Sequence, residues 1–215
     1  MAILAVNAGS SSLKFSLHPL QGGQVQPSVL TGCIAGLEPA GSPEMDWSFA
    51  GQRQRQAVTG EGESPFQRAL ASLRSLLARL EGAPSIRAVA HRVVHGGQAF
   101  RESVLVSDAV LERLARLNSL APLHQPHNLA GIRSFRQAFP ALPQVACFDT
   151  AFHANLPDVA SAFALPQSLT EQGVRRYGFH GLSYHYIMDT LRQQSPRALG
   201  RVLMAHLGNG ASMCA

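Results

Sequence analysis

Hydrophobic and polar positions along the chain repeat with two periods, which separate predicted strands from predicted helices. Residues 2–6 form an apolar run that stops at a small polar stretch, 7–12, and residues 13–18 then alternate between apolar and polar. This pattern predicts a β-hairpin whose turn is rich in hydroxyls and backbone N–H groups. Since side chains two apart on a strand share a face, we expect Ser12, Lys14 and Ser16 on one face and the apolar side chains between them on the core face.

The same two periods predict the elements that follow. Residues 20–63 are rich in Gly, Pro, Gln and Ser and hold strands near 28–36 and 46–50. Later strands are expected at 86–94, 144–148 and 201–207. Helices are expected from the Ser64 cap to Gly82, from the Ser107 cap to about 117, from about 127 to 139, and from a Ser183 cap to about 194. Strands come first and then alternate with helices, which favours an α/β fold.

Composition narrows the classes of function. The chain has 215 residues, is 46% hydrophobic and 14% charged, and carries a net charge of +5 from scattered arginines. That distribution favours a basic cleft for anionic substrates over a nucleic-acid face. The three cysteines lack metal-binding or redox spacing, and we find neither a signal-peptide pattern nor an apolar run of membrane-spanning length. We therefore expect a cytoplasmic protein that binds neither nucleic acid nor membrane.

The first turn is a candidate phosphate site. Small residues let a backbone approach a phosphate closely, and Lys14, the single lysine of the chain, follows on the polar face. Neither the G-x-x-x-x-G-K-[ST] loop nor G-x-G-x-x-G occurs. The alternative is an ordinary hairpin turn.

Four further groups of residues are candidates for substrate binding, metal binding or catalysis. Arg92 and Val94 share a strand face before Gly96-Gly97, which suits a small carboxylic acid; the alternative is an arginine paired with a protein carboxylate. The spacing of His124 and His127 permits a metal, but the flanking prolines disfavour a regular helical pair. Asp149 follows a buried strand and either orients a substrate, deprotonates it or caps a helix. His180 lies near the positive end of a helix, which favours a nearby anion.

A weak internal repeat links the two ends of the chain. Aligning Gly9 with Gly208 places two apolar strands over each other, each entering a Gly-containing polar turn, with Asn7 over His206. The repeat predicts two related domains that each offer one turn to a shared ligand.

Six motifs together resemble the acetate kinase family: NAGSSSLKF, HRVVHGG, APLH, FDTAFH, YGFHG and HLGNGAS, in the family's order from residue 2 to residue 215. The resemblance implies a ribonuclease-H-like (actin-like ATPase) α/β domain, a mixed sheet flanked by helices, over 1–150. A similar nucleotide-binding domain would start over 151–215. The implied reaction is reversible transfer of the ATP γ-phosphoryl group to acetate with Mg²⁺, or Mn²⁺ in its place, in a homodimer.

The resemblance also implies roles for individual residues. Asn7 would bind magnesium, and Arg92 would hold the acetate carboxylate. Asp149 would be the active-site carboxylate, and His180 would stabilise the transition state. The remaining assignments are Lys14, Ser10 and Ser12 to nucleotide phosphate, Val94, Leu123 and Phe179 to the methyl pocket, His124 to the cleft, and His206, Leu207, Gly208, Asn209 and Gly210 to a second phosphate loop.

The chain departs from the family at its end, and the sequence leaves two alternatives to an acetate kinase open. Family members continue well past residue 215, so we expect the adenine pocket, a second active-site arginine and an acidic magnesium ligand to lie outside this chain. Sequence also leaves open a kinase of a longer acid, propionate or butyrate, because one methylene is worth only about 1–3 kcal/mol. A non-catalytic ligand-binding fragment is the third possibility.

Overall fold

The computed structural model of the protein describes residues 1–58, 62–208 and 210–215. Contacts divide the chain into two compact units. The first contains Met1–Val93 and Val104–Ala146, and the second contains Val94–Ser103 and Cys147–Ala215. The chain therefore passes between the units more than once, and the single domain boundary expected after residue 150 stays a prediction.

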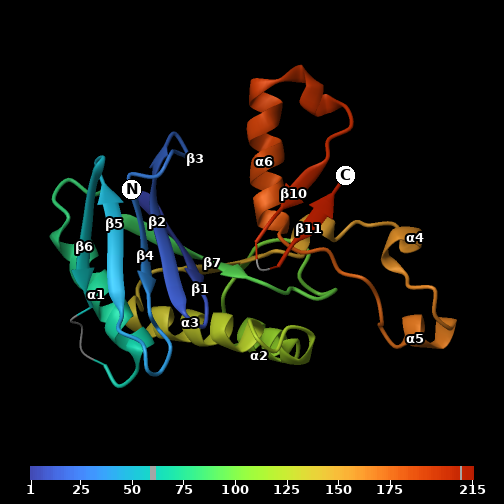
Figure 1. The fold of residues 1–215 in the computed structure, drawn as a ribbon, viewed down its shortest axis with the longest axis horizontal. Coiled ribbons are helices and arrows are strands. Elements are labelled where there is room, and N and C mark those ends of the chain that lie inside the picture. The colour runs from blue at the N-terminus through green and yellow to red at the C-terminus, as the bar shows by residue number, and fades with distance from the viewer. Residues whose placement is uncertain (59–61, 209) are drawn as a thin grey trace. The chain divides into compact units, whose positions relative to one another are not determined.

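The first unit is built on a mixed β-sheet in the order β6-β5-β4-β2-β1-β7-β9-β8 (Figure 1). Antiparallel pairs join β1 to β2, β2 to β4, β4 to β5, β5 to β6 and β8 to β9, whereas β1 and β7 run parallel. The strands are β1 (Ala2–Ala8), β2 (Ser12–Gln21), β4 (Leu30–Ala35), β5 (Glu44–Phe49), β6 (Gln52–Ala57), β7 (Ile86–Val93), β8 (Val104–Leu105) and β9 (Gln144–Phe148), with the short β3 (Gln24–Val25) beside β2.

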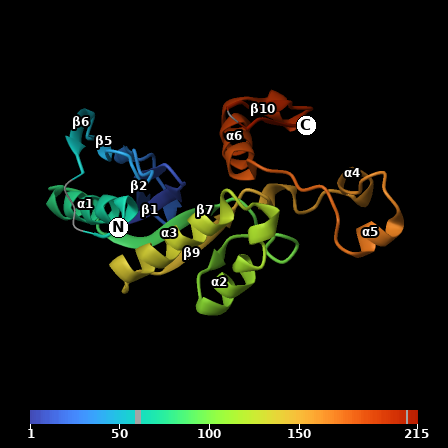
Figure 2. The ribbon, with the colours of Figure 1, turned by 60° about the horizontal axis from the view of Figure 1, so that its bottom comes forward.

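One face of this sheet carries the core. The apolar side chains of the central strands are buried with those of helix α1 (Pro65–Arg79) and Phe135 of helix α3 (Gln125–Ala138). Both helices lie along the same side of the sheet in Figures 1 and 2. Full burial of one such leucine or phenylalanine contributes about 1.5–3 kcal/mol. The remaining helices of the unit are α2 (Asp108–Ala115) and the single turn η1 (Asn118–Leu120).

The opposite face of the same sheet is polar. Asn7, Lys14, Cys33, Asp46 and Arg55 are directly paired neighbours across five successive strands and form one row. Lys14 is exposed, while Leu13 and Phe15 beside it are buried, so the predicted alternation of β2 is confirmed. We call these five residues the polar row.

The second unit consists mainly of turns and short helices. Its long helix, α6 (Gly181–Gln194), lies beside the hairpin of β10 (Met204–His206) and β11 (Ser212–Cys214) in both views (Figures 1 and 2). The other elements are η2 (Ala151–His153), α4 (Asp158–Ser161), α5 (Gln167–Glu171) and η3 (Pro196–Leu199). Tyr184 of α6 is completely buried, and the rings of Phe100 and Phe148 stack with centroids 5.3 Å apart.

Most predicted elements are confirmed, including the α/β class and the Ser64 and Ser107 helix caps. The Ser183 cap is wrong. His180 occupies the N-cap position of α6 with a left-handed φ of 58°, so the helix begins at Gly181. The strand predicted over 201–207 is shorter, and β6 was missed because it contains no large apolar side chain. No helix in the described part of the chain has the length and apolar character to cross a membrane.

Candidate functional site

The residues singled out by the motifs fall into both units, and each set is described within its own unit. The first unit holds Asn7, Ser10, Ser12, Lys14, Arg92, Leu123 and His124. The second holds Val94, Asp149, Phe179, His180, His206, Leu207, Gly208 and Gly210. Asn209 lies outside the described residues.

In the first unit, the structure brings Asn7, Lys14 and Arg92 together on the polar face of the sheet. Asn7 and Lys14 are directly opposite each other in the β1–β2 register. The Nη1 atom of Arg92 donates to Asn7 Oδ1 at 3.3 Å. The turn ahead of them is closed by Gly9 N–H donating to the Ser12 carbonyl at 2.9 Å. The strands therefore gather two cations and an amide at one end of the polar row.

Helix α3 holds the end of β1 in place below this group. The buried Asn128 Nδ2 donates to the Ala8 carbonyl at 2.8 Å. A Cβ atom added at Gly131 would lie 2.6 Å from the Ala8 methyl, so only glycine allows this approach of helix to strand. Both residues were missed by sequence reasoning, because their partner lies more than 100 positions earlier in the chain.

His91 lies on the core face, next to Arg92 in sequence, and is structural. Its Nε2 contacts Gln144 Oε1 at 2.5 Å, while Gln144 Nε2 donates to the Phe135 carbonyl at 3.4 Å. The amide oxygen of Gln144 must therefore accept, which places the imidazole proton on Nε2. Burial lowers the pKa of His91 to about 4. The side chain is neutral at pH 7.

In the second unit, His180 is held by a chain of hydroxyl groups. Its Nδ1 contacts Ser212 Oγ at 2.8 Å, and Ser212 Oγ contacts the Tyr184 hydroxyl at 2.6 Å. Because Tyr184 is fully buried, its hydroxyl proton needs an acceptor, and Ser212 Oγ provides it. Ser212 then donates to His180 Nδ1. This donor order places the proton of neutral His180 on Nε2.

His206 packs directly against His180. The two imidazole rings are parallel, with centroids 4.0 Å apart and an interplanar angle of 8°. His206 Nδ1 also contacts Ser183 Oγ at 3.2 Å, which explains what the Ser183 hydroxyl does in place of the predicted cap.

Backbone contacts join three motifs around Asp149. Asp149 is 2% exposed, and its carbonyl accepts from the Gly181 N–H at 2.9 Å. A Cβ atom at Gly181 would collide with that carbonyl oxygen. Gly96 N–H donates to Thr150 Oγ1 at 3.0 Å. The HGG, FDT and YGFHG segments are thereby fixed to one another.

His95 completes this junction from the core side. Its Nδ1 accepts from the Gly97 N–H at 2.8 Å, and its ring packs edge-on against Tyr177 and Phe179 with centroids at 4.5 and 5.5 Å. Burial lowers the pKa of His95. Phe179 is also fixed by its carbonyl, which lies 3.1 Å from His153 Nε2. Val94 and Phe179 are half-buried in this unit, whereas Leu123 in the first unit is 76% exposed.

The predicted repeat has a structural counterpart. The two aligned segments are both antiparallel hairpins, β1–β2 and β10–β11. Asn7 pairs with Lys14, and His206 pairs with Ser212, one residue closer in sequence than the alignment requires. The strand-turn-strand pattern is thus repeated, but the aligned residues pair in a different register in the second copy.

Groups of side chains that could bind a metal are scarce among the described residues. No cluster of three or more His, Cys, Asp or Glu side chains suited to a metal ion occurs among residues 1–58, 62–208 and 210–215. His124 occupies the N-cap position of α3 without a capping hydrogen bond from its side chain. Asn7 offers one neutral oxygen, which already accepts from Arg92.

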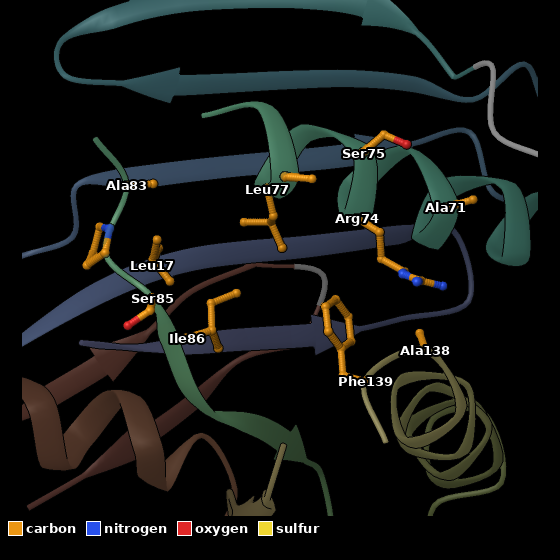
Figure 3. Close-up of a pocket in the computed structure, with 12 residues that line it drawn as sticks. Leu17, Ala71, Arg74, Ser75, Leu77, Ala83, Ser85, Ile86, Ala138 and Phe139 are labelled. Atoms are coloured by element: carbon orange, nitrogen blue, oxygen red, sulfur yellow. The ribbon is translucent and has the colours of Figure 1, made fainter. Parts of the chain in front are cut away.

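A prominent hollow in the first unit lies away from the motif residues. It has a volume of about 650 Å³ between α1, the segment leading into β7, and the end of α3 (Figure 3). Arg74 is positioned over the Phe139 ring at its rim, 5.9 Å from the centroid. The other walls come from Leu17, Leu77, Ala83, Ile86 and Ala138. None of the motif residues lines this hollow, so its volume does not identify it as the candidate functional site.

Comparison with known proteins identifies a family. The acetokinase family profile matches residues 2–215. Acetate kinases from Rhodopseudomonas palustris and Rhizobium meliloti are 46% and 45% identical, each over 99% of this chain and 54% of the relative. A propionate kinase structure from Francisella tularensis aligns with a TM-score of 0.86 and 35% identity over all of this chain and 54% of that one. A Porphyromonas gingivalis acetate kinase aligns with a TM-score of 0.80 and 32% identity over 99% of this chain and 54% of that one. These likenesses confirm the predicted fold class, and the chain spans about half the length of the relatives that it matches.

Proposed function

Because the chain belongs to the acetokinase family, we propose that it forms part of a kinase that reversibly transfers the γ-phosphoryl group of ATP to acetate. The products are acetyl phosphate and ADP, formed by direct in-line transfer. The observation that carries this proposal is the group of Arg92, Asn7 and Lys14 on the polar face of the first unit. It places two cations of different geometry beside each other.

Arg92 and Lys14 suit different parts of the reactants. A guanidinium has five N–H donors in a planar fork, so one contact with Asn7 is compatible with bidentate binding of the acetate carboxylate. Lys14 is a compact charge that suits a phosphate oxygen, and Ser10 and Ser12 add hydroxyl donors from the same turn. Phosphoryl transfer depends mainly on such positioning and on neutralising oxygen charge.

His180 supplies a donor toward the transferred phosphoryl group. The Tyr184–Ser212–His180 order leaves the imidazole proton on Nε2, so the neutral ring can donate without a change of charge. Acetate is already ionised at pH 7, so no strong base is required. Asp149 therefore acts in positioning, through its backbone contact with Gly181 at the start of α6. The loop of His206, Leu207, Gly208, Asn209 and Gly210 binds nucleotide phosphate in this proposal.

The residues of this chain do not by themselves predict a magnesium site. The ion usually takes one or two carboxylates together with substrate phosphates, and it favours oxygens that face no cation. Asn7 Oδ1 faces the Arg92 guanidinium instead. The magnesium role of Asn7 thus rests on the family resemblance. A homodimer and a cytoplasmic location have the same basis.

A second candidate is a kinase of propionate or butyrate. It is supported by the likeness to the Francisella tularensis propionate kinase structure. Val94, Leu123 and Phe179 are the side chains that we propose to contact the alkyl group in either case. The ratio of kcat/KM for acetate and propionate separates the two kinases, with about a tenfold or larger preference expected for the correct acid.

The proposal is tested by trapping acetyl phosphate with hydroxylamine in mixtures of protein, ATP, Mg²⁺ and acetate. Calorimetry with acetate and with Mg–ATP on the same preparation separates the kinase from a non-catalytic ligand-binding module. Binding of both ligands together with formation of the hydroxamate supports the kinase. Absence of acetate binding to a folded protein contradicts it.

A further inference from the structure

A small cationic hollow in the second unit is not used by the proposed function. It lies where the loop after His95, the turn η2 and the segment leading to Phe179 meet. Its volume is about 20 Å³. The residues that line it are Gly97, Gln98, Arg101, Thr150, His153, Ala154, Arg175, Arg176, Tyr177 and Gly178.

The residues that line this hollow carry positive charge only. Three arginines line it, Arg101, Arg175 and Arg176, and no Asp or Glu is among the described residues that line it. The ion pairs found between described residues involve other arginines. Like charges gathered at one point repel one another, so the folded unit gains free energy from any anion that enters.

Arg175 contributes the strongest evidence. Its Nε atom is buried and has no hydrogen-bond acceptor among the described residues. Its guanidinium lies over the Tyr177 ring, with Cζ 5.7 Å from the centroid, so stacking restricts the side chain in this position. A buried donor left without an acceptor destabilises a fold by about 1–3 kcal/mol. An anionic oxygen at this point removes that cost.

The neighbouring groups are also held in place. Arg176 lies over the Phe163 ring at 5.3 Å and donates from Nη1 to the Ala160 carbonyl at 3.4 Å. Thr150 Oγ1 accepts from Gly96 N–H and keeps its own hydroxyl proton as a donor. Gln98 adds an amide. These are the donor types that recognise oxyanions, and they come from three separate segments.

The volume indicates how a ligand would enter. A space of about 20 Å³ admits roughly one water-sized group. One oxygen of a tetrahedral anion fits inside, and the other oxygens remain outside, where Arg101 is exposed.

We propose that this hollow binds a small oxyanion of the phosphate class, with one oxygen accepting from Arg175 Nε and the others facing Arg101 and Arg176. The proposal rests on geometry and charge within the second unit and does not depend on the proposed kinase activity. Binding would join residues 97–101 to residues 175–178. Since His153 also contacts the Phe179 carbonyl, the anion would stabilise the segment that leads to His180.

The direct test is a titration of the full chain with sodium phosphate, observed through the arginine side-chain Nε–H signals by NMR. Ionic strength is held constant with sodium chloride. We expect the Arg175 Nε–H signal to shift, saturate and exchange more slowly with water. Arg175→Gln lacks this signal, so its affinity is followed through the Nε–H signals of Arg101 and Arg176, which also line the hollow. An affinity for phosphate that Arg175→Gln lowers by at least about tenfold supports the proposal, as expected for a lost charge-assisted hydrogen bond.

Two matched variants keep the test decisive if Arg175→Gln fails to fold. Arg101→Gln removes an exposed cation of the hollow and should weaken phosphate binding about threefold to tenfold. Arg192→Gln removes an exposed cation of α6 and should leave the affinity unchanged. Equal affinities in the wild type and Arg101→Gln, or no shift of Arg175 at saturating phosphate, would overturn the proposal.

A third variant and a second ligand identify the source of the signal. If Lys14→Gln abolishes phosphate binding and Arg101→Gln retains it, the phosphate binds at the proposed nucleotide site. That result contradicts this inference. Titration with glycerol 2-phosphate in place of phosphate distinguishes a phosphate ester from the free phosphate ion as the ligand. Tighter binding of the ester supports a phosphorylated metabolite as the ligand, and tighter binding of inorganic phosphate supports the free ion.

Discussion

The two units position their candidate functional side chains in different ways. In the first unit, Asn7, Lys14 and Arg92 project from regular strands whose register is set by a buried core beneath them. In the second, His180 and Asp149 lie at turns and are held by single backbone and hydroxyl contacts. Many residues together hold a site built on strands in position, whereas a site built on turns depends on a few individual contacts.

The largest effect that this contrast predicts is at Gly181. In Gly181→Ala the added methyl meets the backbone carbonyl of Asp149, which cannot move without disturbing the motif junction. We expect a loss of at least about 3 kcal/mol of stability, measured as faster amide hydrogen exchange across α6. Gly200→Ala is the control, since its Cβ would lie at an ordinary 3.4 Å from the Arg197 carbonyl. Equal exchange rates in both variants would show that the junction tolerates change.

Acid sensitivity tests the core beneath the polar row. Unfolded His91 has a pKa near 6.5, but the folded value is about 4, so the unfolded chain binds more protons between these values. Stability should therefore fall as the pH drops from 6.5 to 4, by about 3 kcal/mol from this residue. Urea unfolding followed by fluorescence of Trp47, which lies in the first unit, measures it. In His91→Gln this part of the pH dependence should disappear; a slope as steep as that of the wild type would contradict the assignment.

The smallest expected effect concerns the hydroxyl chain in the second unit. Tyr184→Phe removes the donor to Ser212 and should cost about 1 kcal/mol. Its more specific consequence is that Ser212 no longer has to donate to His180, so the Nδ1–H tautomer becomes populated. Long-range ¹H–¹⁵N NMR of the imidazole nitrogens reports the tautomer directly. Tyr186→Phe, at an exposed position on the same helix, should leave the His180 signals unchanged.

The same contrast explains what sequence reasoning found. The alternation around Lys14 and the caps at Ser64 and Ser107 are local patterns, and all three were predicted correctly. The Ser183 cap was wrong, because a left-handed residue at position 180 starts the helix earlier and no local pattern announces a non-glycine residue in that conformation.

Long-range partners explain what sequence reasoning missed. Ser212 meets His180 across 32 residues, Gln144 meets His91 across 53, and Asn128 meets Ala8 across 120. Such pairs depend on how the elements pack, which single-sequence periodicity does not contain. The hollow around Arg175 was missed for the same reason, since Arg101 reaches it from another segment. The family resemblance suggested candidate reacting residues but not the contacts that orient them.

The central claim is that Arg92 binds the carboxylate of the acid substrate, and the acetate KM of Arg92→Ala tests it most directly. Arg87→Ala, which removes an exposed arginine from the same strand, is the matched control. Loss of a charge-assisted bidentate contact should raise the KM for acetate by about tenfold to a hundredfold, with a much smaller change in the KM for ATP. A KM for acetate equal to that of Arg87→Ala would contradict the account.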